Sequence, residues 1–140
     1  IMPLVIQTAL GQRDFVSILG SDYPTDDGTC VRDYIHVMDL ARAHILALKY
    51  LEKGNESDIF NLGNGSGYSV KEIIDAVKRV SGKDFTVKTE PRRPGDPARL
   101  VASAQKAKNI LGWEPEFKDL DEIIKTAWNW HKNYPGGYQS

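Results

Sequence analysis

Two arginine–aspartate groups in the sequence could bind an anion, and Arg32-Asp33 is the first of them. It lies where a loop rich in turn-forming residues meets an apolar, β-rich stretch. A guanidinium held by a strand suits a phosphate, because its planar fork matches two oxygens. Adjacent side chains of a strand point to opposite faces, so we expect Arg32 and Asp33 to have different roles. A structural ion pair is the alternative role for Arg32.

The second group lies in residues 91–97, which read Pro-Arg-Arg-Pro-Gly-Asp-Pro. Three prolines restrict the backbone and a glycine permits a tight turn, so we expect a stiff, non-helical loop. Long arginine side chains that are ordered in advance lose less entropy when an anion binds. The Asp96 carboxylate can accept hydrogen bonds from sugar hydroxyls. The alternative is a solvated charged turn.

The other motifs in the sequence do not indicate a cofactor, metal or catalytic site. Gly63-x-Gly65-x-Gly67 follows an expected strand and precedes an expected helix, but its spacing is not that of a dinucleotide loop, so we interpret it as a structural turn. The three histidines show no metal-ligand spacing with Cys30 or acidic residues, and no serine nucleophile motif is present. The sequence therefore predicts no metal site and no nucleophile.

The composition bounds the class of protein. The chain has 140 residues, with 18 Lys and Arg against 19 Asp and Glu. That length suits one domain, and the balanced charge argues against a general nucleic-acid or acidic-membrane binder. A single cysteine cannot form an internal disulfide, which favours a reducing compartment such as the cytoplasm. The chain begins inside an apolar pattern, so we expect it to be a fragment of a longer protein.

The elements that must position these residues alternate between helix and strand, which predicts an α/β fold. The apolar spacing, capping residues and glycines predict the following order: helix 4–9, strand 15–19, loop 21–29, strand 31–37, helix 39–53 capped by Asp39, strand 58–62, helix 70–81 with a Ser69–Glu72 capping box, strand 85–87, a short helix capped by Ser103 and ending at Gly112, and a last helix from Asp119.

Residues 23–44 (Tyr-Pro-Thr-Asp-Asp-Gly-Thr-Cys-Val-Arg-Asp-Tyr-Ile-His-Val-Met-Asp-Leu-Ala-Arg-Ala-His) carry a family resemblance. With residues 59–63, 91–96 and 136–138, this block resembles the C-terminal part of the UDP-glucose (UDP-galactose) 4-epimerases. The implied fold class is α/β: the C-terminal substrate-binding part of an extended short-chain dehydrogenase/reductase, with the NAD-binding Rossmann half missing. Residues 1–140 would be one UDP-sugar-binding portion, and elements around 34–62 would normally complete the Rossmann domain.

The resemblance implies NAD-dependent inversion at C4 of a UDP-hexose through a 4-keto intermediate, with a Tyr-x-x-x-Lys pair as acid and base. No tyrosine here has a lysine four residues later, and no Gly-x-x-Gly-x-x-Gly is present. The catalytic residues and the NAD site are therefore expected outside this chain. NAD is expected as the cofactor of the parent enzyme, and it is not expected to bind this fragment alone.

Site residues follow from the resemblance position by position. Arg32 and Arg93 would bind the diphosphate of the substrate, and Asp96 would meet its ribose. The remaining positions would contact uracil, line the pocket or lie against the sugar, in that order: Ser17, Ile18 and Leu19; Tyr34 and Val70; Leu100. The moderate size of Leu100 suggests tolerance of N-acetylated hexoses.

The resemblance also predicts binding partners for the chain, and two alternative functions remain open. The predicted partners are UDP-glucose or UDP-galactose, the missing N-terminal half and, in the parent enzyme, a second subunit of a homodimer. The fragment could also self-associate or swap segments, and no nucleic-acid or membrane partner is expected. The alternatives are a UDP-pentose or UDP-uronate 4-epimerase and a non-catalytic UDP-sugar binding module.

Overall fold

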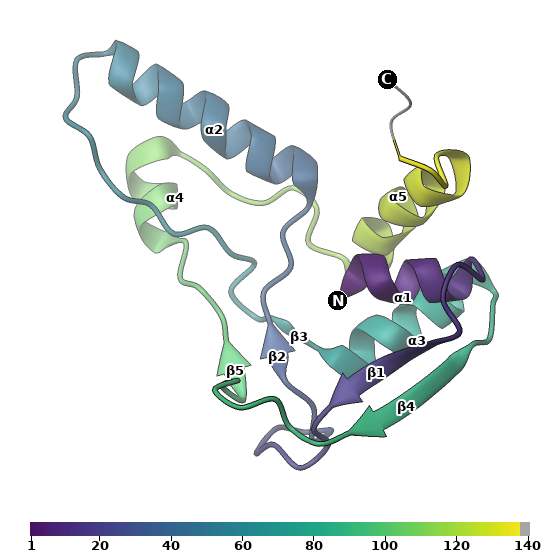
Figure 1. Ribbon diagram of the computed structural model, residues 1–140. Coiled ribbons are helices and arrows are strands. Elements are labelled where there is room, and N and C mark those ends of the chain that lie inside the picture. Colours follow the sequence, from purple (N-terminus) through teal and green to yellow (C-terminus); the bar gives the residue numbers. More distant parts are fainter. Residues whose placement is uncertain (138–140) are drawn as a thin grey trace.

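The computed structural model describes residues 1–137 and consists of two small sheets with helices beside them (Figure 1). The elements run in this order: α1 (Met2–Ala9), β1 (Phe15–Leu19), β2 (Val31–Arg32), α2 (Val37–Glu52), β3 (Tyr68–Ser69), α3 (Val70–Ser81), β4 (Thr86–Glu90), β5 (Arg99–Leu100), α4 (Gln105–Leu111) and α5 (Leu120–Asn133). The α/β class predicted from the alternation is therefore observed. Tyr138, part of the resemblance at the C-terminal end, lies outside the described residues.

The main core lies between the parallel pair β1–β4 and the helices α1, α3 and α5 (Figure 1). Helix α3 supplies the central apolar stripe, with Ile73, Ile74 and Val77 buried. The predicted capping box is confirmed: the Ser69 hydroxyl accepts the Glu72 amide at 3.0 Å, and the Ser69 amide donates to the Glu72 carboxylate at 2.6 Å. Two otherwise unpaired backbone donors are thereby satisfied, which fixes where α3 begins.

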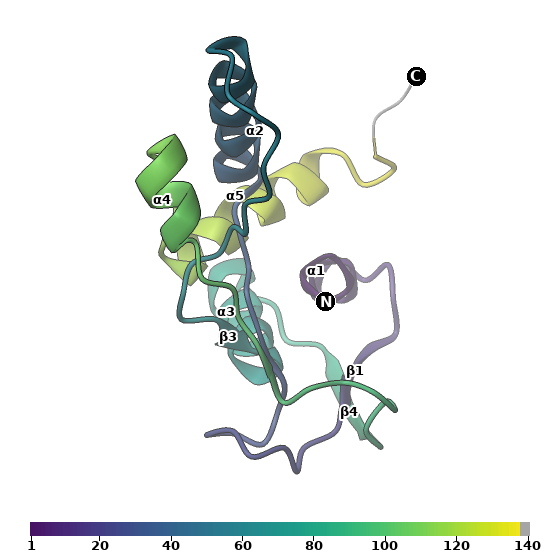
Figure 2. The same cartoon turned by 90° about the vertical axis from the view of Figure 1, so that its left-hand side faces the viewer.

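A second apolar cluster joins α2 to α4 and is set apart from the first (Figure 2). Trp113 is fully buried there, and its indole N–H donates to the backbone oxygen of Asp39 at 2.8 Å. The short sheet β3-β2-β5 lies below α4 and beside α3 in the view of Figure 1, with β2 antiparallel to β3 and parallel to β5. Its pairing brings residues 31–32, 68–69 and 99–100 together from distant parts of the chain.

Several expected boundaries differ from the structure: β4 extends to Glu90 instead of ending at residue 87, and α1 begins at Met2 instead of residue 4. Residues 58–62 form no strand, because no described segment pairs with them, and the predicted strand 31–37 is ordered as a ladder only over β2. Helix α2 begins at Val37 with His36 as its N-cap, and α4 has Ala104 rather than Ser103 at its N-cap. Strands need partners that local sequence does not reveal. The Asp119 cap of α5 is confirmed, since its carboxylate accepts the Glu122 amide at 3.0 Å.

Within residues 1–137, no helix is long and apolar enough to cross a bilayer. The same described residues contain no group of three or more potential metal-ligating side chains.

Candidate functional site: a cationic cleft beside β1

Two guanidinium groups converge on one carboxylate. Arg93 donates to both oxygens of Asp96, from Nη2 at 2.8 Å and from Nε at 3.1 Å. Arg32 Nη2 lies 3.6 Å from the same Oδ1 that Arg93 contacts. The Arg32 guanidinium also donates from Nη1 to the Val31 oxygen at 2.8 Å. The β2 strand and the 91–97 turn therefore bring together two cations that are far apart in the sequence.

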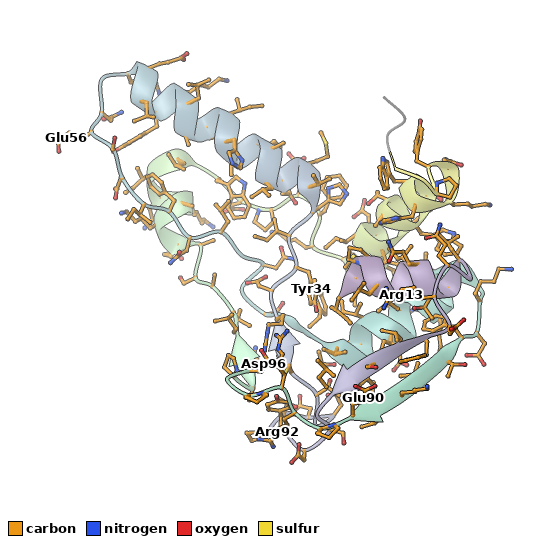
Figure 3. The ribbon with its side chains drawn as sticks, viewed as in Figure 1. Arg13, Tyr34, Glu56, Glu90, Arg92 and Asp96 are labelled. Atoms are coloured by element: carbon orange, nitrogen blue, oxygen red, sulfur yellow. The ribbon has the colours of Figure 1, made fainter. Side chains whose placement is uncertain are left out.

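These side chains form one wall of a cleft of about 490 Å³. The other walls include β1, the start of α1, the segment after β2 and the start of α3. Figure 3 labels four of the lining residues, Arg13, Tyr34, Glu90 and Asp96. The lining residues are the following: Ile1, Leu4, Arg13, Phe15, Val16, Ser17, Leu19, Cys30, Arg32, Tyr34, Val70, Glu90, Arg93 and Asp96. The structure thus brings seven of the predicted site residues to one cavity.

Two predicted site residues lie elsewhere. Ile18 of β1 packs on the main core, because side chains of a strand alternate between its faces. Leu100 pairs with Arg32 in the β2–β5 ladder and is 61% exposed, but it does not line the cleft. The prediction that Leu100 faces a sugar stays a prediction.

The edge of β1 adds backbone groups to the site. Among residues 1–137, β1 pairs only with β4, so its other edge has no ladder partner. The Ser17 hydroxyl donates to the Glu90 carboxylate at 2.8 Å, which links the two strands inside the cleft. Unpaired strand edges offer both N–H donors and C=O acceptors to a ligand. The backbone groups of such an edge can form hydrogen bonds with a planar ligand group that has donors and acceptors along one side.

Neighbouring charges and burial set the protonation states of two side chains in the cleft, Asp96 and Tyr34. Hydrogen bonds from Arg93 hold the pKa of the Asp96 carboxyl below its usual range, so this group is charged at neutral pH. Burial raises the pKa of Tyr34 to about 12, and the phenol stays protonated. The Tyr34 hydroxyl is buried and has no hydrogen-bond partner among the described residues. It remains available to a ligand in the cleft.

The carboxylate of Asp33, which lies on the other side of the chain from Arg32, supports the site. It accepts the Asn64 amide at 2.8 Å and the Ala102 amide at 3.2 Å. A side chain at Gly63 would place its Cβ 2.4 Å from this carboxylate, so the close approach requires glycine. The expected difference in role between Arg32 and Asp33 is observed: one lines the cleft and the other joins loops.

Seven residues that line the cleft were not predicted as site residues: Ile1, Leu4, Arg13, Phe15, Val16, Cys30 and Glu90. Phe15 belongs to the predicted strand 15–19, whereas Glu90 lies beyond the predicted strand 85–87 and ends the longer strand β4. Nothing in the local pattern showed that β1 and β4 are neighbours. Arg13 was a usable signal, since it is a cation directly before an apolar strand. A second cleft, of about 610 Å³, lies around Gly63, Ser103 and Trp113 and holds none of the predicted site residues.

Comparison with known proteins shows the family. The chain belongs to the family described as GDP-mannose 4,6 dehydratase, whose sequence model matches residues 1–127. The UDP-glucose 4-epimerase of Halalkalibacterium halodurans is 54% identical over all 140 residues, and the match covers 42% of that protein. The chain therefore spans less than half the length of this curated relative.

Solved structures agree with this relationship. A crystal structure of a UDP-glucose 4-epimerase superposes with a TM-score of 0.95 at 57% identity, and the match covers 99% of this chain and 42% of that one. The UDP-glucose 4-epimerase from Bifidobacterium longum, solved in complex with NAD⁺ and UDP, gives a TM-score of 0.88 at 39% identity. That match covers 98% of this chain and 40% of the other.

The predicted fold class is wrong in the way it divides the protein into a substrate-binding part and a separate NAD-binding half. It treats the chain as the C-terminal substrate-binding part with the NAD-binding Rossmann half missing, yet one family model runs without a break over residues 1–127. The elements around 34–62, which the resemblance assigns to the nucleotide-binding domain, are present and include α2. The predicted function as a C-terminal sugar-binding fragment without the NAD site depends on the same division and is withdrawn with it.

Proposed function

We propose that this chain is part of a UDP-hexose 4-epimerase and that the cleft beside β1 binds the nucleoside diphosphate of its substrate. The observation that carries the proposal is the convergence of Arg32 and Arg93 at one point of the cleft. A diphosphate needs charge compensation at two adjacent phosphoryl groups, and two planar guanidinium forks supply it. The identity to UDP-glucose 4-epimerases supports the uridine and hexose parts of the proposal.

The other predicted residues receive roles consistent with this arrangement. In the proposal, the unpaired edge of β1 between Ser17 and Leu19 reads the base through its backbone, while Val70 packs against the nucleoside. The Tyr34 hydroxyl, which has no hydrogen-bond partner within residues 1–137, donates to a ligand oxygen. Asp96 accepts from the ribose hydroxyls. UDP-glucose and UDP-galactose are the proposed ligands of the whole enzyme.

NAD is the proposed cofactor of the whole enzyme, where it would take a hydride from C4 of the sugar and return it. The Gly63–Gly67 loop does not fit a dinucleotide. It follows an irregular segment rather than a parallel strand, and Gly67 packs against Val31 and Val101. We therefore place no cofactor contact on this loop. The prediction that NAD does not bind to this chain alone depends on the corrected division and is dropped.

Contact with further polypeptide is also proposed. Helix α2 exposes an apolar face, and Ile59 after it is 83% exposed. Exposed apolar patches of this kind mark interaction surfaces. This feature supports the predicted contact with another part of the whole protein, self-association of the chain, or both, and the homodimer of the parent enzyme stays a prediction. The reducing compartment inferred from the single cysteine also stays a prediction.

The test is calorimetric titration of the chain with UDP and UDP-glucose, in wild type and in Arg32→Ala and Arg93→Ala variants. Each substitution removes charge-assisted hydrogen bonds, so we expect the Kd for UDP to rise about 10- to 100-fold. Arg79→Ala is the matched control, because Arg79 pairs with Asp121 outside the cleft, and it should leave the Kd unchanged. Equal UDP affinity in wild type and both cleft variants would refute the assignment.

A further inference from the structure

Asp96 occupies the arginine pair that the proposed ligand needs. Its Oδ1 lies 2.8 Å from Arg93 Nη2 and 3.6 Å from Arg32 Nη2, and its Oδ2 accepts from Arg93 Nε at 3.1 Å. The Asp96 side chain is only 18% exposed, whereas that of Arg93 is 67% exposed. In the free chain, therefore, one internal carboxylate takes the position of an anion between two cations.

The turn keeps this carboxylate in place. The Asp96 amide donates to the Arg93 oxygen at 3.3 Å, which closes the turn between the two partners. Arg92 anchors the same turn from outside, because its Nε donates to Asp22 at 2.6 Å and its guanidinium stacks on the Tyr23 ring at 4.2 Å. The flanking prolines further restrict the backbone. These contacts hold the turn, and with it the carboxylate, beside the two cations.

A phosphate ligand must compete with this internal partner. When a diphosphate takes the guanidinium groups of Arg32 and Arg93, the Asp96 carboxylate loses its hydrogen bonds and is left beside added negative charge. A charged group that is partly buried and unpaired is unfavourable. The cost is offset only if the ligand brings donors that the carboxylate can accept, and the hydroxyls of a ribose are such donors.

We propose that Asp96 is a specificity-determining counter-ion: it holds the arginine pair in the free chain and yields it only to ligands that carry both a diphosphate and hydroxyl donors. The proposal rests on the proposed function, since it concerns the same cleft. It predicts weaker binding of bare pyrophosphate, because pyrophosphate displaces the Asp96 carboxylate from the arginines and offers it no hydroxyl donor. The ribose hydroxyls of a nucleoside diphosphate donate to the displaced carboxylate and so offset the free-energy cost of displacing it.

The experiment compares inorganic pyrophosphate with UDP as ligands of the chain, by calorimetry at fixed ionic strength. Asp96→Asn keeps the shape and removes the charge, so pyrophosphate should bind about tenfold more tightly than to wild type. The ratio of UDP affinity to pyrophosphate affinity should fall by about the same factor, because UDP gains from the released arginines but exchanges a charged ribose acceptor for the weaker amide oxygen of asparagine. Asp84→Asn is the matched control, since Asp84 pairs with Lys78 and neither residue lines the cleft, and it should change the ratio less than about twofold.

Two outcomes overturn the proposal: pyrophosphate binds Asp96→Asn no more tightly than wild type, or the affinity ratio does not change. Asp96→Ser, which also removes the charge, provides a second variant, and circular dichroism establishes that each variant is folded. The two proposals fail separately. If UDP binding does not depend on Arg32 and Arg93, the proposed function fails, whereas a normal UDP dependence with unaltered pyrophosphate affinity in Asp96→Asn removes only this inference.

Discussion

Replacing Asp39 by asparagine should destabilise the chain strongly, because its carboxylate is fully buried and joins two segments. Its two oxygens accept the backbone amides of Glu116 at 2.9 Å and Phe117 at 3.0 Å. Arg42, one turn further along α2, lies 3.2 Å from Oδ1. The substitution Asp39→Asn conserves volume, so its effect isolates charge and hydrogen bonding from packing.

The magnitude follows from the donors that the carboxylate serves. An asparagine oxygen can accept one of the two backbone amides, but its NH₂ group then faces the other, and two donors cannot bond. One charge-assisted hydrogen bond is weakened and one buried N–H is left unpaired, each change costing about 1–3 kcal/mol. Arg42 keeps its contact with Glu116 at 2.8 Å, which limits the loss. We expect a decrease of about 3 kcal/mol in the free energy of unfolding.

Urea unfolding followed by tryptophan fluorescence measures this change, since Trp113 is fully buried beside Asp39. Asp75→Asn is the matched control: Asp75 forms an exposed pair with Lys71 on α3, and its loss should cost less than about 0.5 kcal/mol. A decrease below about 1 kcal/mol for Asp39→Asn would show that the amide pair contributes little and would refute the reasoning.

Two further predictions concern the loop before β2. Gly28→Ala should lower the free energy of unfolding by at least about 2 kcal/mol in urea titrations, because φ is +78° and the new Cβ would lie 2.2 Å from the Ser21 oxygen. Gly11→Ala, with a similar φ of +75° but open space around it, should cost less, and an equal cost would contradict the clash. Burial alone would raise the pKa of Asp27, but hydrogen bonds, first that from Ser69, lower it overall. Its stabilising effect is therefore present above about pH 4 and lost as the pH falls further. The difference in unfolding free energy between wild type and Asp27→Asn should shrink below about pH 4, and a difference that is constant down to about pH 2 would contradict this sign.

Local patterns predicted the helices well. The stretch 70–81 carries its own start signal in Ser69 and Glu72, its own apolar stripe, and its own end at Gly82. Such signals act within a few residues, so the sequence contains all of them. Asp119 gives the same information for α5. Asp39 shows the limit of this reasoning: it looks like a cap, but its carboxylate serves a segment that lies more than seventy residues away.

The candidate site was only partly predictable. Residue types and the stiff 91–97 turn indicated anion binding, and the family resemblance selected Arg32, Arg93 and Asp96. No pattern indicated that Asp96 already occupies both arginines, because this depends on the distance between β2 and the turn. The pairing of β1 with β4, which brings Ser17 to Glu90, was equally hidden from local patterns.

By itself, the sequence determined where the helices lie along the chain, the bounds of α3 and the cap of α5, which residues could hold a phosphate, and the relationship to sugar-nucleotide epimerases. Caps, glycines and apolar periodicity are short-range properties, so they can be read along the chain. The tertiary structure alone decided which strands pair, why residues 58–62 remain unpaired, and that the cations of β2 and the 91–97 turn meet at one carboxylate. Those facts depend on contacts between residues far apart in sequence, and no local preference encodes them.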